Sequence, residues 1–75
     1  MGVNTPRSYS SPLRAAQAQE TRRRILDSAR FLFAGNGYPT TTIAAIARHA
    51  GVSADTVYGA FGTKAHLLKQ LLDAV

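Results

Sequence analysis

The spacing of apolar residues predicts a chain built from helices. In the first helical stretch, about residues 17 to 34, apolar side chains recur every three or four positions and form one stripe. The stripe consists of Ile25, Leu26, Ala29, Leu32 and Phe33. Gly35 and Gly37 follow it, and glycine readily takes the left-handed conformation that ends a helix. On the exposed side, Glu20 precedes Arg24 by four residues, a spacing that favours an ion pair.

Three shorter helices are predicted to follow, each introduced by a hydroxyl residue. Thr42, Ser53 and Thr63 stand just before the helical stretches, and these residue types cap helix N-termini with their side-chain oxygen. We expect the helices at about residues 43 to 49, 54 to 60 and 64 to 75. No stretch alternates apolar and polar residues as a half-buried strand does. The predicted fold class is therefore all-α.

The two ends of the chain differ from the middle. Residues 1 to 16 contain prolines, serines and arginines without apolar periodicity, which predicts a flexible basic arm ahead of a domain formed by residues 17 to 75. At the other end, Leu71, Leu72 and Val75 keep the helical spacing, and no glycine or proline ends the helix. This pattern favours a helix that continues. We therefore expect a longer natural protein whose C-terminal domain is absent from this chain.

Composition narrows the function classes. The chain has 75 residues and no cysteine, so it has neither a disulfide nor a cysteine-based zinc site, and two histidines are too few for an all-histidine metal site. Its formal net charge of +5 favours nucleic acid or an anionic surface as a partner. No apolar run is long enough for a membrane span, and the N-terminus lacks the apolar region of a secretory signal. These features predict a cytoplasmic protein, and composition alone leaves binding to a membrane surface open.

The segment around Gly51 has the pattern of a helix-turn-helix. Such a motif needs a tight turn, an inward apolar residue beside it, and small or polar residues where the second helix begins. Gly51, Val52 and the run from Ser53 to Thr56 meet these needs in that order. In this motif the second helix lies in the major groove of DNA. The segment therefore predicts both a trihelical fold, extended by the start of a fourth helix, and a double-stranded DNA partner.

Longer motifs make the match more specific. Between about Thr21 and Leu72 the chain reads RRRIL, SA and FLFAGNGY, then TTIAAIARHAGVS, TVYGAF and GTKAHLL. In these motifs it resembles the TetR family of bacterial transcriptional regulators. The resemblance implies a homodimeric, ligand-responsive repressor on a palindromic operator. Dimerisation and effector binding would belong to the absent C-terminal domain, so we expect this chain alone to be monomeric and to bind DNA weakly.

The resemblance also implies which residues face the bases: Ala54, Asp55, Thr56 and Gly59. Alanine can contact a thymine methyl group, and the carboxylate of Asp55 can accept a hydrogen bond from cytosine N4. An acid in the first turn of a helix also stabilises the helix dipole, so this second role for Asp55 stays open.

The phosphate contacts implied by the resemblance are Thr42, Ser53, Tyr58, Lys64, Arg22 and Arg23. Each has an alternative role. Thr42 and Ser53 serve equally as helix caps, and helix N-termini also bind anions. Tyr58 is otherwise a core residue, and Lys64 a solvated surface residue. Glu20 and Asp27 are alternative partners for the arginines, and Arg7 and Arg14 on the arm are candidates for non-specific or minor-groove contacts.

Two positions depart from the family pattern. Ala60 stands where the family commonly has a histidine or tyrosine, which removes one expected phosphate contact. Ala45 stands where an acid often completes a capping box with Thr42, so the start of the second helix loses part of a cap worth ~1 kcal/mol.

Two other functions compete with DNA binding. The chain could be a helical protein-interaction module that docks through Leu67–Leu72, or a basic amphipathic element on an anionic membrane, although short capped helices fit a globular core better. A salt-dependent titration against DNA separates them. An enzyme is not predicted, because Ser53, His49 and Asp55 do not form a nucleophile–base–orienter set and no phosphate-binding glycine loop is present. No cofactor is expected.

Overall fold

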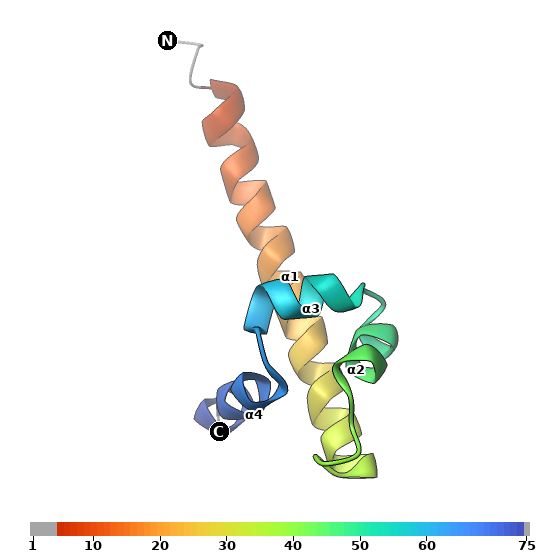
Figure 1. The fold of residues 1–75 in the computed structure, drawn as a ribbon. Helices are drawn as coiled ribbons and strands as arrows, with labels where there is room; N and C mark the ends of the chain where they lie inside the picture. The colour runs from red at the N-terminus through yellow and green to blue at the C-terminus, as the bar shows by residue number, and fades with distance from the viewer. Residues whose placement is uncertain (1–4, 75) are drawn as a thin grey trace.

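The computed structural model describes residues 5 to 74, with side chains from residue 12 onward. Over this range the chain forms four helices and no strand (Figure 1). The helices are α1 (Thr5–Asn36), α2 (Ile43–Ala50), α3 (Ala54–Phe61) and α4 (Lys64–Asp73). The predicted all-α class is confirmed.

Helix α1 begins much earlier than the sequence pattern predicted. Residues 5 to 16, expected to be a flexible arm, are the first turns of this helix. Side chains from residue 12 to residue 20 are exposed, so packing does not hold this stretch in place. Its helicity follows from the good helix formers between Arg14 and Glu20, which extend a helix already nucleated by the core, although Pro12 removes one backbone hydrogen bond. Apolar periodicity detects buried helix faces and therefore missed it. The side chain of Arg7 lies outside the described residues.

The three shorter helices begin at the predicted residues. Thr42 Oγ1 accepts a hydrogen bond from the N–H of Ala45 at 3.1 Å, and Ser53 Oγ accepts one from Thr56 at 3.1 Å. Thr63 caps α4 in the same way. At the end of α2, Gly51 has φ 78°, the left-handed conformation in which a side chain is costly. The hydroxyl caps and this glycine therefore set the boundaries of the helix-turn-helix.

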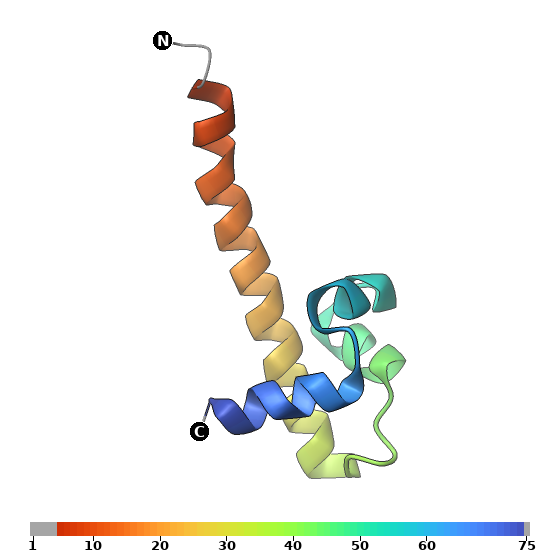
Figure 2. The ribbon, with the colours of Figure 1, turned by 60° about the vertical axis from the view of Figure 1, so that its left-hand side comes forward.

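A single core joins the four helices. The buried apolar side chains are Ile25 and Ala29 from α1, Ile46, Ala47 and Ala50 from α2, Val57 and Phe61 from α3, and Leu67 from α4. In Figures 1 and 2, α2 and α3 pack beside the C-terminal half of α1, and α4 crosses that half of the helix. The N-terminal half of α1 extends past α3. None of the described helices is both long and apolar enough to cross a membrane.

Candidate nucleic-acid interface

The α2–α3 turn leaves one face of α3 open to solvent. Val57 is fully buried and anchors the helix in the core. Asp55, Thr56 and Gly59 are exposed, and their spacing of one and three residues places them together on the outer side. Ala54 is half-buried and packs against the core, so only part of its methyl group is open. Three of the four residues predicted to face bases thus lie on the open face of α3.

Hydroxyl groups at the start of α3 keep one proton available for a ligand. Ser53 Oγ and Thr56 Oγ1 lie 2.9 Å apart, and either can donate to the other. The pair has two hydroxyl protons and uses one of them in this contact. Thr42 is exposed, and its Oγ1 acts as acceptor in the cap of α2, so its own proton also stays available. Capping and anion binding are therefore compatible at both helix N-termini.

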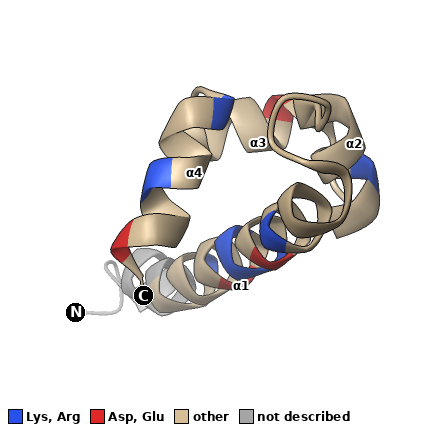
Figure 3. Ribbon diagram, turned by 90° about the horizontal axis from the view of Figure 1, so that it is seen from below, with Lys and Arg blue, Asp and Glu red and all other residues tan. Residues whose placement is uncertain are grey.

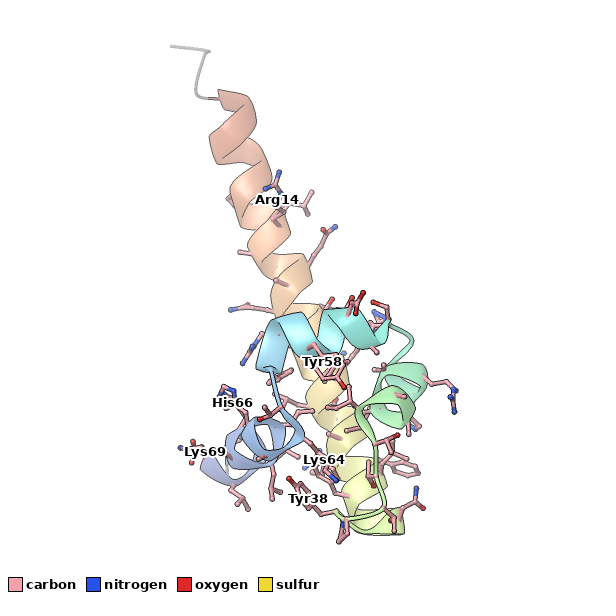
Figure 4. All side chains as sticks on the ribbon, in the orientation of Figure 1. Arg14, Tyr38, Tyr58, Lys64, His66 and Lys69 are labelled. Atoms are coloured by element: carbon pink, nitrogen blue, oxygen red, sulfur yellow. The ribbon has the colours of Figure 1, made fainter. Side chains whose placement is uncertain are left out.

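Tyr58 lies on the surface of α3 with 52% of its area exposed. It is not a core residue. Figure 4 shows its ring pointing from α3 toward the end of the molecule that carries Lys64 and Tyr38. The phenol is therefore accessible to a ligand that contacts α3 and α4 together.

Lys64 is engaged by the chain itself. Its Nζ donates to the carbonyl oxygens of Tyr38 at 2.7 Å and Thr41 at 3.0 Å, and it lies 4.2 Å from the centroid of the Tyr38 ring. An ammonium group has three N–H donors, so two are used internally and one remains. Lys64 is thus not a fully solvated surface lysine, and only part of its donor capacity is open to a ligand. Its hydrogen bonds hold the loop before α2 against the start of α4.

The two arginines predicted to contact phosphate also have partners within the chain. Arg22 Nη1 donates to the carbonyl oxygen of Ala60 at 3.1 Å, and its guanidinium lies 4.5 Å from the centroid of the Phe61 ring. This contact ties the C-terminal end of α3 to α1. Arg23 pairs with Glu20 at 2.6 Å and Asp27 at 2.8 Å. Its side chain lines the groove between α1 and α4 and does not line the groove beside α3.

The predicted pair between Glu20 and Arg24 is replaced by the pair between Glu20 and Arg23. The hydrogen bond from Arg23 holds the pKa of the Glu20 carboxyl below its ordinary value. Arg24 instead reaches the helix-turn-helix, where its Nη2 lies 3.8 Å from the position that a Cβ on residue 51 would occupy. Among the described residues Arg24 forms no salt bridge. The sequence spacing assigned Arg24 to Glu20, and Arg24 was not among the predicted phosphate contacts, because spacing alone does not decide which arginine the acids engage.

Charge is distributed unequally between α3 and its neighbours. Figure 3 shows an acidic position on α3 and basic positions on α1, α2 and α4. Asp55 is the charged residue of α3, which contains no lysine or arginine. Electrostatic attraction for an anionic partner must therefore come from the helices around α3. Within the described residues, no group of three or more His, Cys, Asp or Glu side chains could hold a metal ion.

Known proteins with similar sequences share this region. Residues 25–71, well over half of the chain, match the model described as bacterial regulatory proteins of the tetR family. The chain is 45% identical over 58 residues to the uncharacterized HTH-type transcriptional regulator TtgW of Pseudomonas putida, covering 77% of this chain and 43% of TtgW. It is 42% identical over 59 residues to the HTH-type transcriptional regulator TtgR of the same species, covering 79% of this chain and 28% of TtgR.

A relative from another organism matches the chain over a similar length and with similar identity. The HTH-type transcriptional regulator AcrR of Shigella flexneri is 40% identical over 55 residues, covering 73% of this chain and 26% of AcrR. The chain thus spans less than half the length of these relatives. No solved structure matches it. The family match covers the turn, the exposed helix α3 and the core beneath them, and on this evidence the chain belongs to the tetR family of bacterial regulatory proteins.

Proposed function

We propose that the chain is the DNA-binding part of a bacterial transcriptional regulator, with α3 in the major groove of double-stranded DNA. The observation that carries the proposal is the open face of α3, formed by Asp55, Thr56 and Gly59, on a helix that Val57 anchors in the core. A major groove admits an α-helix, and residues near its N-terminus then reach base edges. Family membership and the names of the relatives, all HTH-type transcriptional regulators, support the same function.

The open face of α3 has the chemistry for reading bases. The Asp55 carboxylate accepts hydrogen bonds, which suits the amino group of cytosine, and the Thr56 hydroxyl both donates and accepts. Gly59 has no side chain and allows close approach of a base or sugar. The exposed part of the Ala54 methyl suits a thymine methyl. Base preference would therefore depend most on Asp55, the charged residue of this helix.

We assign phosphate binding to hydroxyl groups at the helix N-termini and on α3, and to basic residues around α3. The free hydroxyl protons at Thr42 and at the Ser53–Thr56 pair, the Tyr58 phenol and the third N–H of Lys64 are suitable donors. We assign a further contact to Arg24, beside Gly51.

Arg22 and Arg23 have less freedom to bind phosphate. Arg22 retains N–H groups besides the Nη1 that binds Ala60. Arg23 would first have to leave its two carboxylate partners, Glu20 and Asp27. Of Arg23 and Arg24, Arg24 is thus better placed to bind phosphate, because it forms no salt bridge among the described residues.

The properties of the whole protein are part of the proposal. A longer protein of this family would act in the bacterial cytoplasm as a homodimeric repressor on a palindromic operator and bind an effector through its remaining domain. The chain alone would be a monomer, because its large exposed hydrophobic side chains are scattered. Among the described residues these are Leu13 and Phe31, 18 positions apart on α1, Tyr58 on α3 and Leu72 on α4. Sedimentation velocity would show a monomer, and a tight dimer would contradict this part of the proposal.

The test of the function is a binding selection from a library of random duplexes. The chain should enrich a short motif, and Asp55→Ala should relax the preference at one base pair, at a cost of ~1–3 kcal/mol in discrimination. Tyr58→Phe should weaken binding to all sequences alike. Recovery of no motif and no measurable affinity for any duplex at low salt would overturn the proposal.

The protein-interaction module is not favoured. Leu67, the first residue of its predicted docking face, is fully buried in the core. Leu71 is half-buried and packs on the same core, which leaves Leu72 as the strongly exposed leucine of α4. The face is thus already used to hold α4 on α1.

A further inference from the structure

An open groove of about 730 Å³ lies between the N-terminal half of α1 and the exposed face of α3. Arg14, Gln17 and Thr21 line it from α1, and Thr56 and Gly59 line it from α3. The groove is therefore continuous with the face that would read bases. Figure 4 shows Arg14 on the part of α1 that extends beyond α3.

The α1 wall of the groove carries hydrogen-bond donors at regular spacing. Arg14, Gln17 and Thr21 stand at i, i+3 and i+7, so they share one face of the helix. Their guanidinium, amide and hydroxyl groups all donate hydrogen bonds, and no carboxylate lines the groove. The remaining wall includes Ala15 and Ala18, whose small side chains allow a chain-like ligand to approach closely.

Positive charge in this groove has no acidic partner within the described part of the protein. Arg14 is exposed and forms no salt bridge among the described residues. Arg22, at the inner end of the groove, donates to Ala60 and stacks on Phe61. An anion entering the groove would therefore meet Arg14 without first displacing a carboxylate.

We infer that this groove binds the sugar–phosphate backbone that borders the major groove occupied by α3, with Arg14 and Gln17 donating to phosphate oxygens. The inference rests on the proposed function and adds a contact to it. A duplex that presents base edges to Thr56 and Gly59 has its backbone beside them, where the α1 wall stands. This wall precedes residues 25–71, the part that matches the family model.

Two matched pairs of variants on α1 test the contact. Arg14→Ala and Gln17→Ala alter the groove beside α3. Arg30→Ala and Gln19→Ala remove the same residue types from the side of α1 that faces the α1–α4 groove. All four side chains are exposed and alanine favours helix, so the variants should keep the fold, which circular dichroism would verify.

The measurement is fluorescence anisotropy of a labelled random-sequence duplex over a series of salt concentrations. Arg14→Ala should reduce the slope of log K against log salt by ~0.9, the loss of one phosphate contact, and Arg30→Ala should leave it unchanged. Gln17→Ala should weaken binding several-fold with an unchanged slope, and Gln19→Ala should bind like the wild type.

The outcomes separate the inference from the function on which it rests. Equal slopes for wild type and Arg14→Ala, or equal losses for Arg14→Ala and Arg30→Ala, would overturn the groove contact while leaving DNA binding by α3 in place. If the wild-type chain shows no salt-dependent affinity for the duplex, the proposed function and the groove contact both fail.

Discussion

Single residues in this domain combine a structural role with a proposed DNA contact, and Lys64 is the clearest case. Its ammonium group holds the Tyr38 and Thr41 carbonyl oxygens, and the side chain is half-buried. Because Thr41 lies directly before the α2 cap Thr42, Lys64 also fixes the position of a predicted phosphate contact. Loss of Lys64 would therefore affect the fold as well as the interface.

Lys64→Met should lower the free energy of unfolding by ~1–3 kcal/mol. The substitution removes two hydrogen bonds from a charged donor and leaves the carbonyl groups of Tyr38 and Thr41 without that donor. Urea denaturation measures the change. The control is Lys69→Met, since Lys69 is exposed and pairs with Asp73 alone among the described residues, and it should change stability by less than ~1 kcal/mol. Equal stability of Lys64→Met and wild type would show that the lysine does not fasten the loop.

The ion pairs of α1 give a second prediction, on pH. The hydrogen bond from Arg23 lowers the pKa of Glu20 below its ordinary value of 4.5 in the folded chain. The pair thus stabilises the fold at pH values above the ordinary pKa of a glutamate, and this contribution is lost as pH falls through the lowered pKa. Arg23→Ala should raise the pKa of Glu20.

Carbon-detected NMR titration of the carboxyl group measures this shift. Arg24→Ala is the matched control, because Arg24 is the weakest of the causes that lower the Glu20 pKa. If the pKa of Glu20 rises more in Arg24→Ala than in Arg23→Ala, then Glu20 pairs with Arg24, as the sequence spacing predicted.

At the scale of the element, α3 carries a feature that lowers its own stability. Gly59 lies inside the helix, and a Cβ placed there would meet no atom within 4 Å. Glycine inside a helix costs ~1 kcal/mol relative to alanine. On the proposed function, its lack of a side chain lets the DNA approach closely.

Gly59→Ala should therefore raise the free energy of unfolding by ~0.5–1 kcal/mol while weakening DNA binding. Gly35→Ala is the matched control, since Gly35 is also helical, exposed and surrounded by open space, but lies at the far end of α1. It should stabilise the chain and leave DNA binding unchanged. Thermal denaturation and anisotropy measure both properties. Equal DNA affinity of the two alanine variants would exclude Gly59 from the interface.

The sequence predicts a helix boundary where neighbouring residues determine it, and it predicts a helix where one face is buried. Hydroxyl caps and Gly51 depend on neighbours in the chain, so the starts of α2, α3 and α4 could be predicted. The N-terminal half of α1 could not, because its exposed residues carry no apolar periodicity.

The contacts of Arg22 with Ala60 and of Lys64 with Tyr38 could not be predicted from the sequence either. They join residues 38 and 26 positions apart, which only the packed fold brings together. For Arg22 and Lys64, residue type alone was therefore a poor guide to which donors stay open to a ligand.

In the whole molecule, α1 connects the core to the proposed DNA interface. Its C-terminal half buries Ile25 and Ala29 in the core. Residues between Arg14 and Arg22 line the groove beside α3, and the N-terminal turns of α1 extend past α3 (Figure 2). Since α3 contains no basic residue, binding of an anionic duplex would require α1, α2 and α4 to supply charge around it. The interface would therefore be a property of the assembled domain and would be lost on unfolding.

The most direct test of DNA binding by α3 is an NMR titration of the isotope-labelled chain with duplex DNA, in which amide shifts map the bound surface. We predict that the largest shifts occur in α3 from Ser53 to Gly59, at Thr42, and along α1 from Arg14 to Thr21. Shifts concentrated in Leu67–Leu72, or no shifts at low salt, would contradict the claim that α3 and its flanking helices form a DNA-binding surface.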